Sequence, residues 1–182
     1  KAQAENFPFC TIDPNIGIVP VPDDRLDKLS EISKSKKKIN TTISFVDIAG
    51  LVKGASKGEG LGNKFLSHIR EVDAIIHLVR CFDSEKIQHV NSKINPLNDL
   101  ESIKTELILS DIDIILKKLE KNKKKLLKIE EISLLEKSLK SLNDGKEIIL
   151  PEAKQERKFL STLGLLSIKP KIIVCNVDES SL

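Results

Sequence analysis

The stretch that decides the fold class is residues 41–63: Thr41-Thr-Ile-Ser-Phe-Val-Asp-Ile-Ala-Gly-Leu-Val-Lys-Gly-Ala-Ser-Lys-Gly-Glu-Gly-Leu-Gly-Asn63. Its first six residues are rich in β-branched and aromatic side chains and predict a strand that stops at Asp47. Five of the eight glycines of the chain fall between Gly50 and Gly62, so a flexible loop follows the strand directly. The carboxyl end of such a strand is where α/β proteins place their ligands.

The tetrapeptide at this point, Asp47-Ile-Ala-Gly50, has the chemistry of a phosphate sensor. Asp47 can reach a metal-bound water, and Gly50 lets the backbone approach a terminal phosphate with its N–H as donor. A loop held in this way is ordered when the γ-phosphate is present and released when it is gone. Asp-x-x-Gly is also found in ordinary glycine-rich surface turns, and that alternative stays open. A dinucleotide site is rejected, because the glycines over 58–62 follow G-x-G-x-G and no strand runs into them.

Strands and helices alternate on both sides of this loop. The pattern predicts strands over 16–21, 74–79 and 171–175, and helices over 25–33 and 63–71. The nearly continuous apolar run 74–79 is typical of a strand that is covered on both faces. The chain is therefore predicted to be an α/β protein with a mostly parallel sheet flanked by helices.

Apolar residues at helical spacing predict a pair of antiparallel, coiled-coil-like helices between the last two of these strands. The two sets are Ile108, Ile112, Ile115 and Leu119, and then Ile132, Leu135, Leu139 and Leu142. The predicted domain organisation is a partial nucleotide-binding domain over 1–97, a helical insertion over 98–166, and a return to the first domain over 167–182.

The expected ends of the insertion's helices come from capping patterns. Asn98 is expected to cap the first helix, with Glu101 at the third helical position. Gly145 is expected to end the pair, since glycine tolerates the left-handed cap position. Pro151 suits the first turn of another helix, which is expected to end near Gly164.

Composition and charge exclude some classes of protein. The 182 residues are 40% hydrophobic, which is enough to form a core. The sequence contains no run of 18 apolar residues, so it predicts no membrane span. Three widely spaced cysteines, Cys10, Cys81 and Cys175, are expected to be free thiols in a reducing cytoplasm. The net charge of +3 is mild, but lysines cluster over 34–38 and 117–128. Such clusters can contact phosphate backbones or can simply be solvated helix faces.

Two further segments would complete a nucleoside-triphosphate site. Thr11, in a proline-containing loop, can place its hydroxyl on Mg²⁺, although an ordinary loop threonine fits as well. Asn176-Val177-Asp178-Glu179 follows the last predicted strand and offers an amide and carboxylates to a base edge. A plain Asn/Asp turn is the alternative there.

The sequence resembles the YchF/Obg-like ATPase family, a branch of the Obg group of translation-factor-type P-loop GTPases. Three motifs carry the resemblance: Asn6-Phe-Pro-Phe-Cys-Thr-Ile-Asp-Pro-Asn15, residues 45–63, and Asn176-Val-Asp-Glu179. The match extends over nearly the whole chain and includes the helical insertion. It implies a P-loop NTPase-type fold, hydrolysis of ATP or GTP with Mg²⁺, association with the ribosome and a cytoplasmic location. We further expect a monomer without a membrane partner, whose lysine clusters contact rRNA phosphates.

The resemblance also implies residue roles. Thr11 corresponds to the switch I threonine that ligates Mg²⁺, Asp47 contacts the metal through water, and Gly50 donates to the γ-phosphate. Switch II corresponds to residues 51–62. The candidate site residues within switch II are Leu51, Gly54, Gly58, Gly60 and Gly62.

The base-recognition motif departs from the usual Asn-Lys-x-Asp. Asn176 is kept, but Val177 stands in place of the lysine and Glu179 in place of the aspartate. Guanine selectivity is expected to be relaxed, because the aspartate is the group that holds the guanine N–H donors. The family accordingly accepts ATP.

The catalytic water cannot be oriented as in Ras-type enzymes, because Leu51 stands where those enzymes have a glutamine. His89 matches a histidine to which the family gives a catalytic role. A single histidine in a loop is also commonly a surface or cap residue, so both interpretations stay open. His68 and His77 are interpreted as packing residues.

No G-x-x-x-x-G-K-[ST] loop occurs in the 182 residues. The family's first strand and phosphate-binding loop are expected before Lys1, and its C-terminal TGS domain after Leu182. Because the phosphate-binding loop supplies the N–H cradle, the phosphate lysine and a Mg²⁺ ligand, these residues alone are expected to bind nucleotide weakly or not at all. The alternative function is a non-catalytic RNA- or protein-binding module with a degenerate nucleotide site.

Overall fold

The computed structural model describes residues 15–48, 61–84, 94–122 and 127–179. The chain divides into two compact units, and each is described by itself. The described part of unit 1 is residues 15–48, and the other described residues belong to unit 2. None of the helices in the described part of the chain combines the length and apolar character that crossing a membrane requires.

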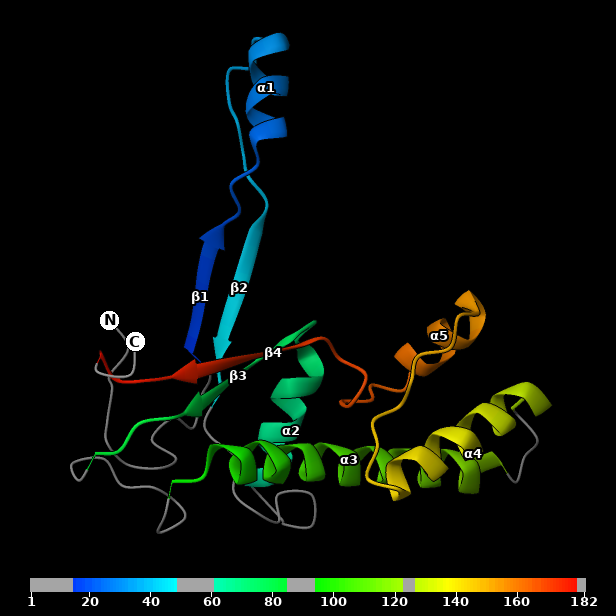
Figure 1. Ribbon diagram of the computed structural model, residues 1–182. Helices are drawn as coiled ribbons and strands as arrows, with labels where there is room; N and C mark the ends of the chain where they lie inside the picture. Colours follow the sequence, from blue (N-terminus) through cyan, green and yellow to red (C-terminus); the bar gives the residue numbers. More distant parts are fainter. Residues whose placement is uncertain (1–14, 49–60, 85–93, 123–126, 180–182) are drawn as a thin grey trace. The chain divides into compact units, whose positions relative to one another are not determined.

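Unit 1 is an antiparallel strand pair with a helix between its strands (Figure 1). Strand β1, Asn15–Pro20, pairs with β2, Thr42–Asp47, from Asn15 opposite Asp47 to Pro20 opposite Thr42. Helix α1, Asp24–Ile32, begins after its N-cap Asp23, whose carboxylate accepts the Arg25 backbone N–H at 3.0 Å. The strand and helix predictions for this segment are confirmed to within two residues.

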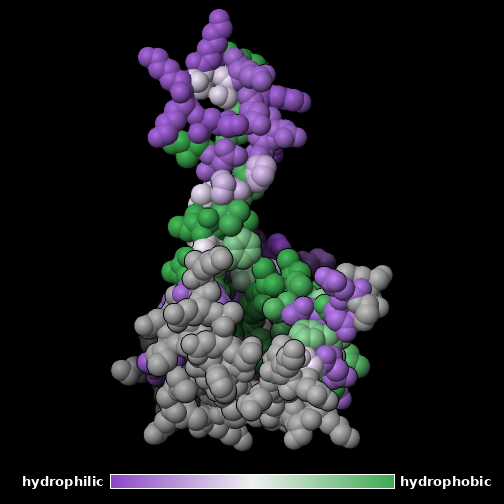
Figure 2. All heavy atoms as spheres, turned by 90° about the vertical axis from the view of Figure 1, so that its left-hand side faces the viewer, coloured by the Kyte–Doolittle hydropathy of each residue, from purple (hydrophilic) through white to green (hydrophobic). Residues whose placement is uncertain are grey.

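The strands of unit 1 keep much of their apolar surface exposed. Ile18 is 66% exposed, and Ile16, Val19, Ile43 and Phe45 are also exposed. Figure 2 shows hydrophobic side chains over this strand pair and hydrophilic ones over the end of the unit that carries α1. The described residues of unit 1 therefore do not bury a core of their own.

Unit 2 contains a parallel strand pair, β3, Ile75–Arg80, and β4, Lys171–Asn176. Helix α2, Leu61–Glu71, leads into β3. One face of the pair buries Val79, while Leu78 on the other face is 62% exposed. The expectation that β3 is covered on both faces is therefore not met by the described residues, although the α/β class and the parallel pairing are confirmed.

The core of unit 2 lies among three helices between β3 and β4: α3, Pro96–Lys121, α4, Ile129–Asn143, and α5, Lys154–Ser161. The predicted helical pair is formed by α3 and α4, and its seam supplies most of the core. The buried members of this core are Ile108, Ile115, Leu135, Leu142, Ile148, Leu160 and Leu165. The chain leaves α4 through Gly145 at φ +71°, as the cap prediction requires.

Two predicted helix starts were wrong. Helix α3 begins at Pro96, with Asn95 as the N-cap whose side chain accepts the Asn98 N–H at 3.1 Å. Asn98 is therefore inside the first turn, because proline at the first helical position costs no hydrogen bond and favours the earlier start. Helix α5 begins at Lys154, so Pro151 precedes the helix and is not in its first turn.

The end of α5 also differs from the prediction. The helix stops at Ser161, and Gly164 lies three residues later at φ +67°. The glycine therefore belongs to the turn after the helix, where the left-handed conformation is needed.

The helical core makes a direct prediction for stability. Leu135 is 0% exposed, so Leu135→Ala is expected to lower the free energy of unfolding by about 2–5 kcal/mol, through lost burial and the cavity left behind. Urea unfolding followed by circular dichroism measures the change. Ile129→Ala, on the same helix but 83% exposed, is the control and is expected to change stability by less than about 0.5 kcal/mol. Equal losses for the two variants would contradict this assignment of the core.

Candidate functional site

The first predicted site residue, Asp47, is the last residue of β2 and is exposed. It lies opposite Asn15, which begins β1. Within the described residues its carboxylate has no hydrogen-bond or ion-pair partner. The strand thus delivers a carboxylate to its carboxyl end, as the sequence predicts.

The base-recognition candidates lie at the carboxyl end of the parallel pair in unit 2. Asn176 is the last residue of β4 and pairs with Arg80 of β3. Its carbonyl accepts the Cys81 N–H at 2.8 Å, which continues the ladder by one residue. Asn176 and Glu179 are exposed, and Val177 between them is half-buried.

Arg80 is a residue of this edge that the sequence interpretation missed. Its guanidinium donates to the carbonyl oxygens of Phe82 at 3.0 Å and Ser84 at 3.2 Å, and it lies 4.8 Å from the centre of the Phe82 ring. Arg80 therefore fixes the backbone immediately after β3, beside Asn176. No local sequence pattern indicates this role, because it depends on how residues 82–84 fold around the Arg80 side chain.

Two of the three cysteines predicted to be free thiols, Cys81 and Cys175, lie at this edge and are free, while Cys10 lies outside the described residues. Burial raises the pKa of the Cys81 thiol, and the neighbouring Cys175 thiol raises it further. A raised pKa favours the protonated form of the Cys81 thiol, which is the less nucleophilic form.

The segment that leads into β4 is held by a buried carboxylate, which the sequence interpretation also missed. Asp111 of α3 is 0% exposed and accepts the backbone N–H groups of Leu166 and Ser167, each at 2.8 Å. Burial raises the pKa of Asp111, while these two N–H donors and the charge of Arg70 act in the opposite direction. Because β4 starts only four residues after Ser167, this carboxylate positions the strand that carries Asn176.

A second anchor holds the same segment. The Lys169 ammonium donates to the carbonyl of Arg70 at 2.8 Å and also to that of Val72, both at the end of α2. The Ile75 N–H then donates to the Pro170 carbonyl at 2.9 Å, where the parallel ladder begins. The start of the parallel pair is therefore fixed from two helices.

Of the remaining predicted site residues, Gly62 belongs to the part of the chain that the structure describes. Gly62 is in the first turn of α2, which begins at Leu61. Seven others lie outside the described residues: Thr11, Gly50, Leu51, Gly54, Gly58, Gly60 and His89. Asp47 and Asn176 belong to different units, so each end of the expected site is described separately.

Asp47 is a described site residue whose donor chemistry suits Mg²⁺. A carboxylate oxygen is a ligand that this hard cation prefers, directly or through water. Within the parts of the chain described here, no three histidine, cysteine or acidic side chains gather into a cation site. Asp47 would therefore hold the metal together with other ligands, as expected for an ion that also binds nucleotide phosphates.

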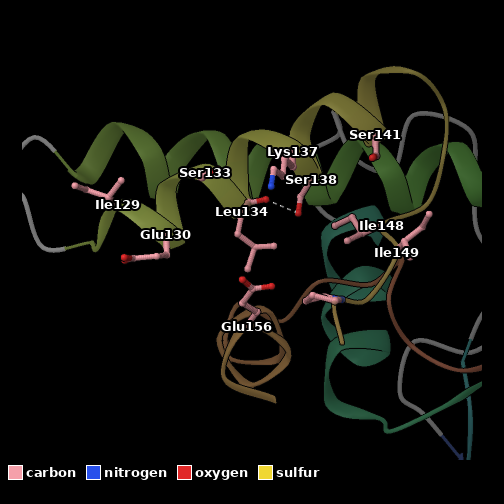
Figure 3. Close-up of a pocket in the computed structure, with 11 residues that line it drawn as sticks. Ile129, Glu130, Ser133, Leu134, Lys137, Ser138, Ser141, Ile148, Ile149 and Glu156 are labelled. Atoms are coloured by element: carbon pink, nitrogen blue, oxygen red, sulfur yellow. Dashed lines mark hydrogen bonds between the residues drawn. The ribbon is translucent and has the colours of Figure 1, made fainter. Parts of the chain in front are cut away.

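A pocket of about 500 Å³ opens in the helical part of unit 2, and none of the predicted site residues that the structure describes lines it (Figure 3). Leu134, Lys137 and Ser138 of α4 and Glu156 of α5 line it, and the Ser138 hydroxyl donates to the Leu134 carbonyl at 2.8 Å. The lining mixes apolar and charged groups and does not converge on one point.

Known proteins similar to this chain agree on one family. Residues 1–118 match the family model described as "50S ribosome-binding GTPase". The "Ribosome-binding ATPase YchF" of Bacillus subtilis (strain 168) is 47% identical and that of Escherichia coli O157:H7 is 49% identical, covering 98% and 97% of this chain and 50% of each relative. The solved structure described as "Structure of the Schizosaccharomyces pombe YchF GTPase" gives a TM-score of 0.72 at 39% identity and covers 97% of this chain and 50% of that one. The chain thus spans about half the length of the curated relatives that it matches.

Proposed function

Because the chain belongs to the 50S ribosome-binding GTPase family and to its YchF branch, we propose that it is part of a nucleotide-dependent switch protein that acts on the ribosome. In this proposal the full-length protein binds and hydrolyses ATP or GTP with Mg²⁺. The Bacillus subtilis and Escherichia coli relatives are both named "Ribosome-binding ATPase YchF", which supports the choice of substrate and partner.

One observation carries the proposal: the structure ends β2 in an exposed carboxylate, Asp47, and β4 in an exposed amide, Asn176. Polar groups at the carboxyl ends of strands are where an α/β protein binds its ligand. Asp47 would hold Mg²⁺ through water, and Asn176 and Glu179 would receive the base. When bound, the metal neutralises charge on the phosphates, while the chain's own residues orient the nucleotide.

The switch elements complete the proposal. We assign the metal-ligating threonine to Thr11, the γ-phosphate contact to Gly50, and the switch II loop to residues 51–62. His89 is the candidate for positioning the attacking water, since Leu51 has no group that can do so. The helical insertion and the flanking segments are proposed to follow the boundaries 1–97, 98–166 and 167–182.

Within this proposal the phosphate cradle is not provided by the 182 residues, which contain no G-x-x-x-x-G-K-[ST] loop. Each unit exposes apolar strand residues, and because such exposure is costly in water we propose that these residues are covered in the full-length protein. We therefore define an extended chain, lengthened at its N-terminus by the strand and phosphate-binding loop of a YchF relative.

Nucleotide binding tests the proposal. The 182-residue chain is expected to bind Mg·ATP too weakly to measure in titration calorimetry, since the loop that supplies most phosphate contacts is missing from it. The extended chain is expected to bind and hydrolyse ATP. Micromolar binding by the 182 residues alone would contradict the claim that the phosphate-binding loop supplies most of the phosphate contacts. An extended chain that binds ribosomes but neither binds nor hydrolyses nucleotide would favour a non-catalytic binding module.

A further inference from the structure

The segment between α1 and β2 carries a concentration of positive charge. Residues 34–38, called the lysine turn below, have the sequence Lys-Ser-Lys-Lys-Lys and are all exposed. The Lys38 ammonium pairs with the Asp27 carboxylate of α1. Within the described residues, Lys34, Lys36 and Lys37 have no acidic partner.

The backbone holds this turn in a defined shape. The Ser35 N–H donates to the Ser30 carbonyl at 3.0 Å and the Lys34 N–H donates to the Glu31 carbonyl at 3.2 Å. These two bonds form a Schellman motif, in which the residue after the cap adopts the left-handed conformation. Val21 closes the segment that connects β1 and β2. Its N–H donates to the Thr41 carbonyl at 2.8 Å, and its carbonyl accepts from the Asn40 side chain at 2.7 Å.

Lys34 occupies the position where glycine is normal. Its φ is +47°, and it is the only non-glycine residue with positive φ in the part of the chain described. A side chain in this conformation costs about 1–2 kcal/mol relative to the ordinary helical region. The turn therefore keeps a lysine side chain at a position where glycine would cost less.

We propose that the lysine turn binds the phosphate backbone of RNA. This inference rests on the proposed function, because it assigns the contact with the ribosome to lysine ammonium groups that bind RNA phosphates. Lysine ammonium groups neutralise phosphates as point charges, and this interaction supplies most sequence-independent nucleic-acid affinity.

The surroundings of the turn favour phosphate contacts over base recognition. Residues 21–44 contain no aromatic side chain on which a base can stack. Arg25, the only arginine of this segment, donates from two guanidinium nitrogens to the Asp23 carboxylate at 2.9 and 2.8 Å. RNA binding here is therefore expected to be independent of base sequence.

The acidic side of α1 disfavours a broad anionic surface such as a membrane. Asp24, Asp27 and Glu31 lie on the helix directly before the turn. An anionic surface broad enough to cover α1 as well as the turn would meet these carboxylates, whereas a single phosphate strand can follow the turn alone. Figure 2 shows the hydrophilic side chains gathered over this end of unit 1.

Binding of the 182-residue chain to a short RNA duplex of arbitrary sequence, measured by fluorescence anisotropy over a series of salt concentrations, tests the inference. Lys36→Gln with Lys37→Gln is expected to weaken binding roughly tenfold and to reduce the slope of log K against log salt by about 2, one unit for each phosphate that is no longer neutralised. The matched control is Lys154→Gln with Lys158→Gln, two exposed lysines of α5, which is expected to leave the slope unchanged.

Lys34→Gly separates function from folding. Glycine relieves the left-handed strain, so the melting temperature is expected to stay the same or rise. RNA affinity is expected to fall several-fold and the salt slope by about 1, because one charge is removed. Unchanged RNA affinity in this variant and in the double variant would overturn the inference.

Two parallel measurements distinguish this inference from the proposed function and from other partners. Wild-type protein that binds the duplex through these lysines but fails to cosediment with ribosomes supports the RNA site and contradicts the ribosomal role. Wild-type protein that does not bind the duplex overturns the inference itself. Binding of polyglutamate or of phosphatidylserine vesicles as tightly as RNA, abolished in the same variants, would assign the turn to an acidic protein or a lipid surface instead.

Discussion

Asp111→Ala is expected to lower the free energy of unfolding by about 2–6 kcal/mol, because it leaves two buried backbone N–H groups without an acceptor, each costing about 1–3 kcal/mol. These groups are the N–H donors of Leu166 and Ser167, which now share the 0% exposed carboxylate. Urea unfolding followed by circular dichroism measures the loss.

The consequence reaches the candidate base pocket. The turn over 166–170 leads directly into β4, so its release is expected to loosen the strand that ends in Asn176. Hydrogen exchange is expected to show faster exchange in β4 than in the wild type. Asp113→Ala is the matched control, two residues along the same helix, where the exposed carboxylate pairs with Lys117 at 2.6 Å. An exposed pair of this kind contributes about 0–1 kcal/mol, so similar losses for both variants would contradict the role given to Asp111.

Asp47→Asn is expected to lower ATP hydrolysis by the extended chain about 100-fold or more. The carboxylate is the described residue best suited to hold Mg²⁺, and metal stabilisation of developing phosphate charge contributes several kcal/mol, where each 1.36 kcal/mol is about tenfold in rate. Steady-state phosphate release at several Mg²⁺ concentrations measures the effect.

The shape of this result distinguishes a metal role from a structural one. Excess Mg²⁺ is expected to recover part of the activity, because the amide oxygen of the variant can still bind the ion weakly. The melting temperature is expected to stay close to that of the wild type, because Asp47 is exposed. Asp24→Asn, an exposed carboxylate of the same unit, is the control and is expected to keep full activity. Full activity in Asp47→Asn would remove this residue from the site.

The sequence predicted the elements of this fold well where local chemistry decides. Strand β2 follows the run of β-branched residues and ends at the charged Asp47. Helix α4 is followed by a turn at Gly145, because glycine readily adopts the left-handed conformation after a helix. The start of α3 was wrong because two capping patterns compete within three residues. Asn95 followed by Pro96 prevails over Asn98, since proline suits the first turn and Asn95 accepts the Asn98 N–H.

What the sequence did not reveal depends on contacts between distant residues. Asp111 lies among apolar seam positions, and nothing local indicates that its acceptors meet N–H donors 55 and 56 residues further on. Arg80 was missed for the same reason, since its role follows from the fold of residues 82–84 around it. The strain at Lys34 likewise follows from the backbone of the helix end.

The central proposal is that Asp47 and Asn176, at the ends of their strands, both contribute to nucleotide binding in the full-length protein. Titration calorimetry of Mg·ATP into the extended chain, into its Asp47→Asn variant and into its Asn176→Ala variant tests this claim most directly. We expect the extended chain to bind Mg·ATP clearly and both variants to bind it with lower affinity. The Asn176→Ala variant is also expected to discriminate less between nucleotide bases. Binding that is equally tight in all three proteins would contradict this claim.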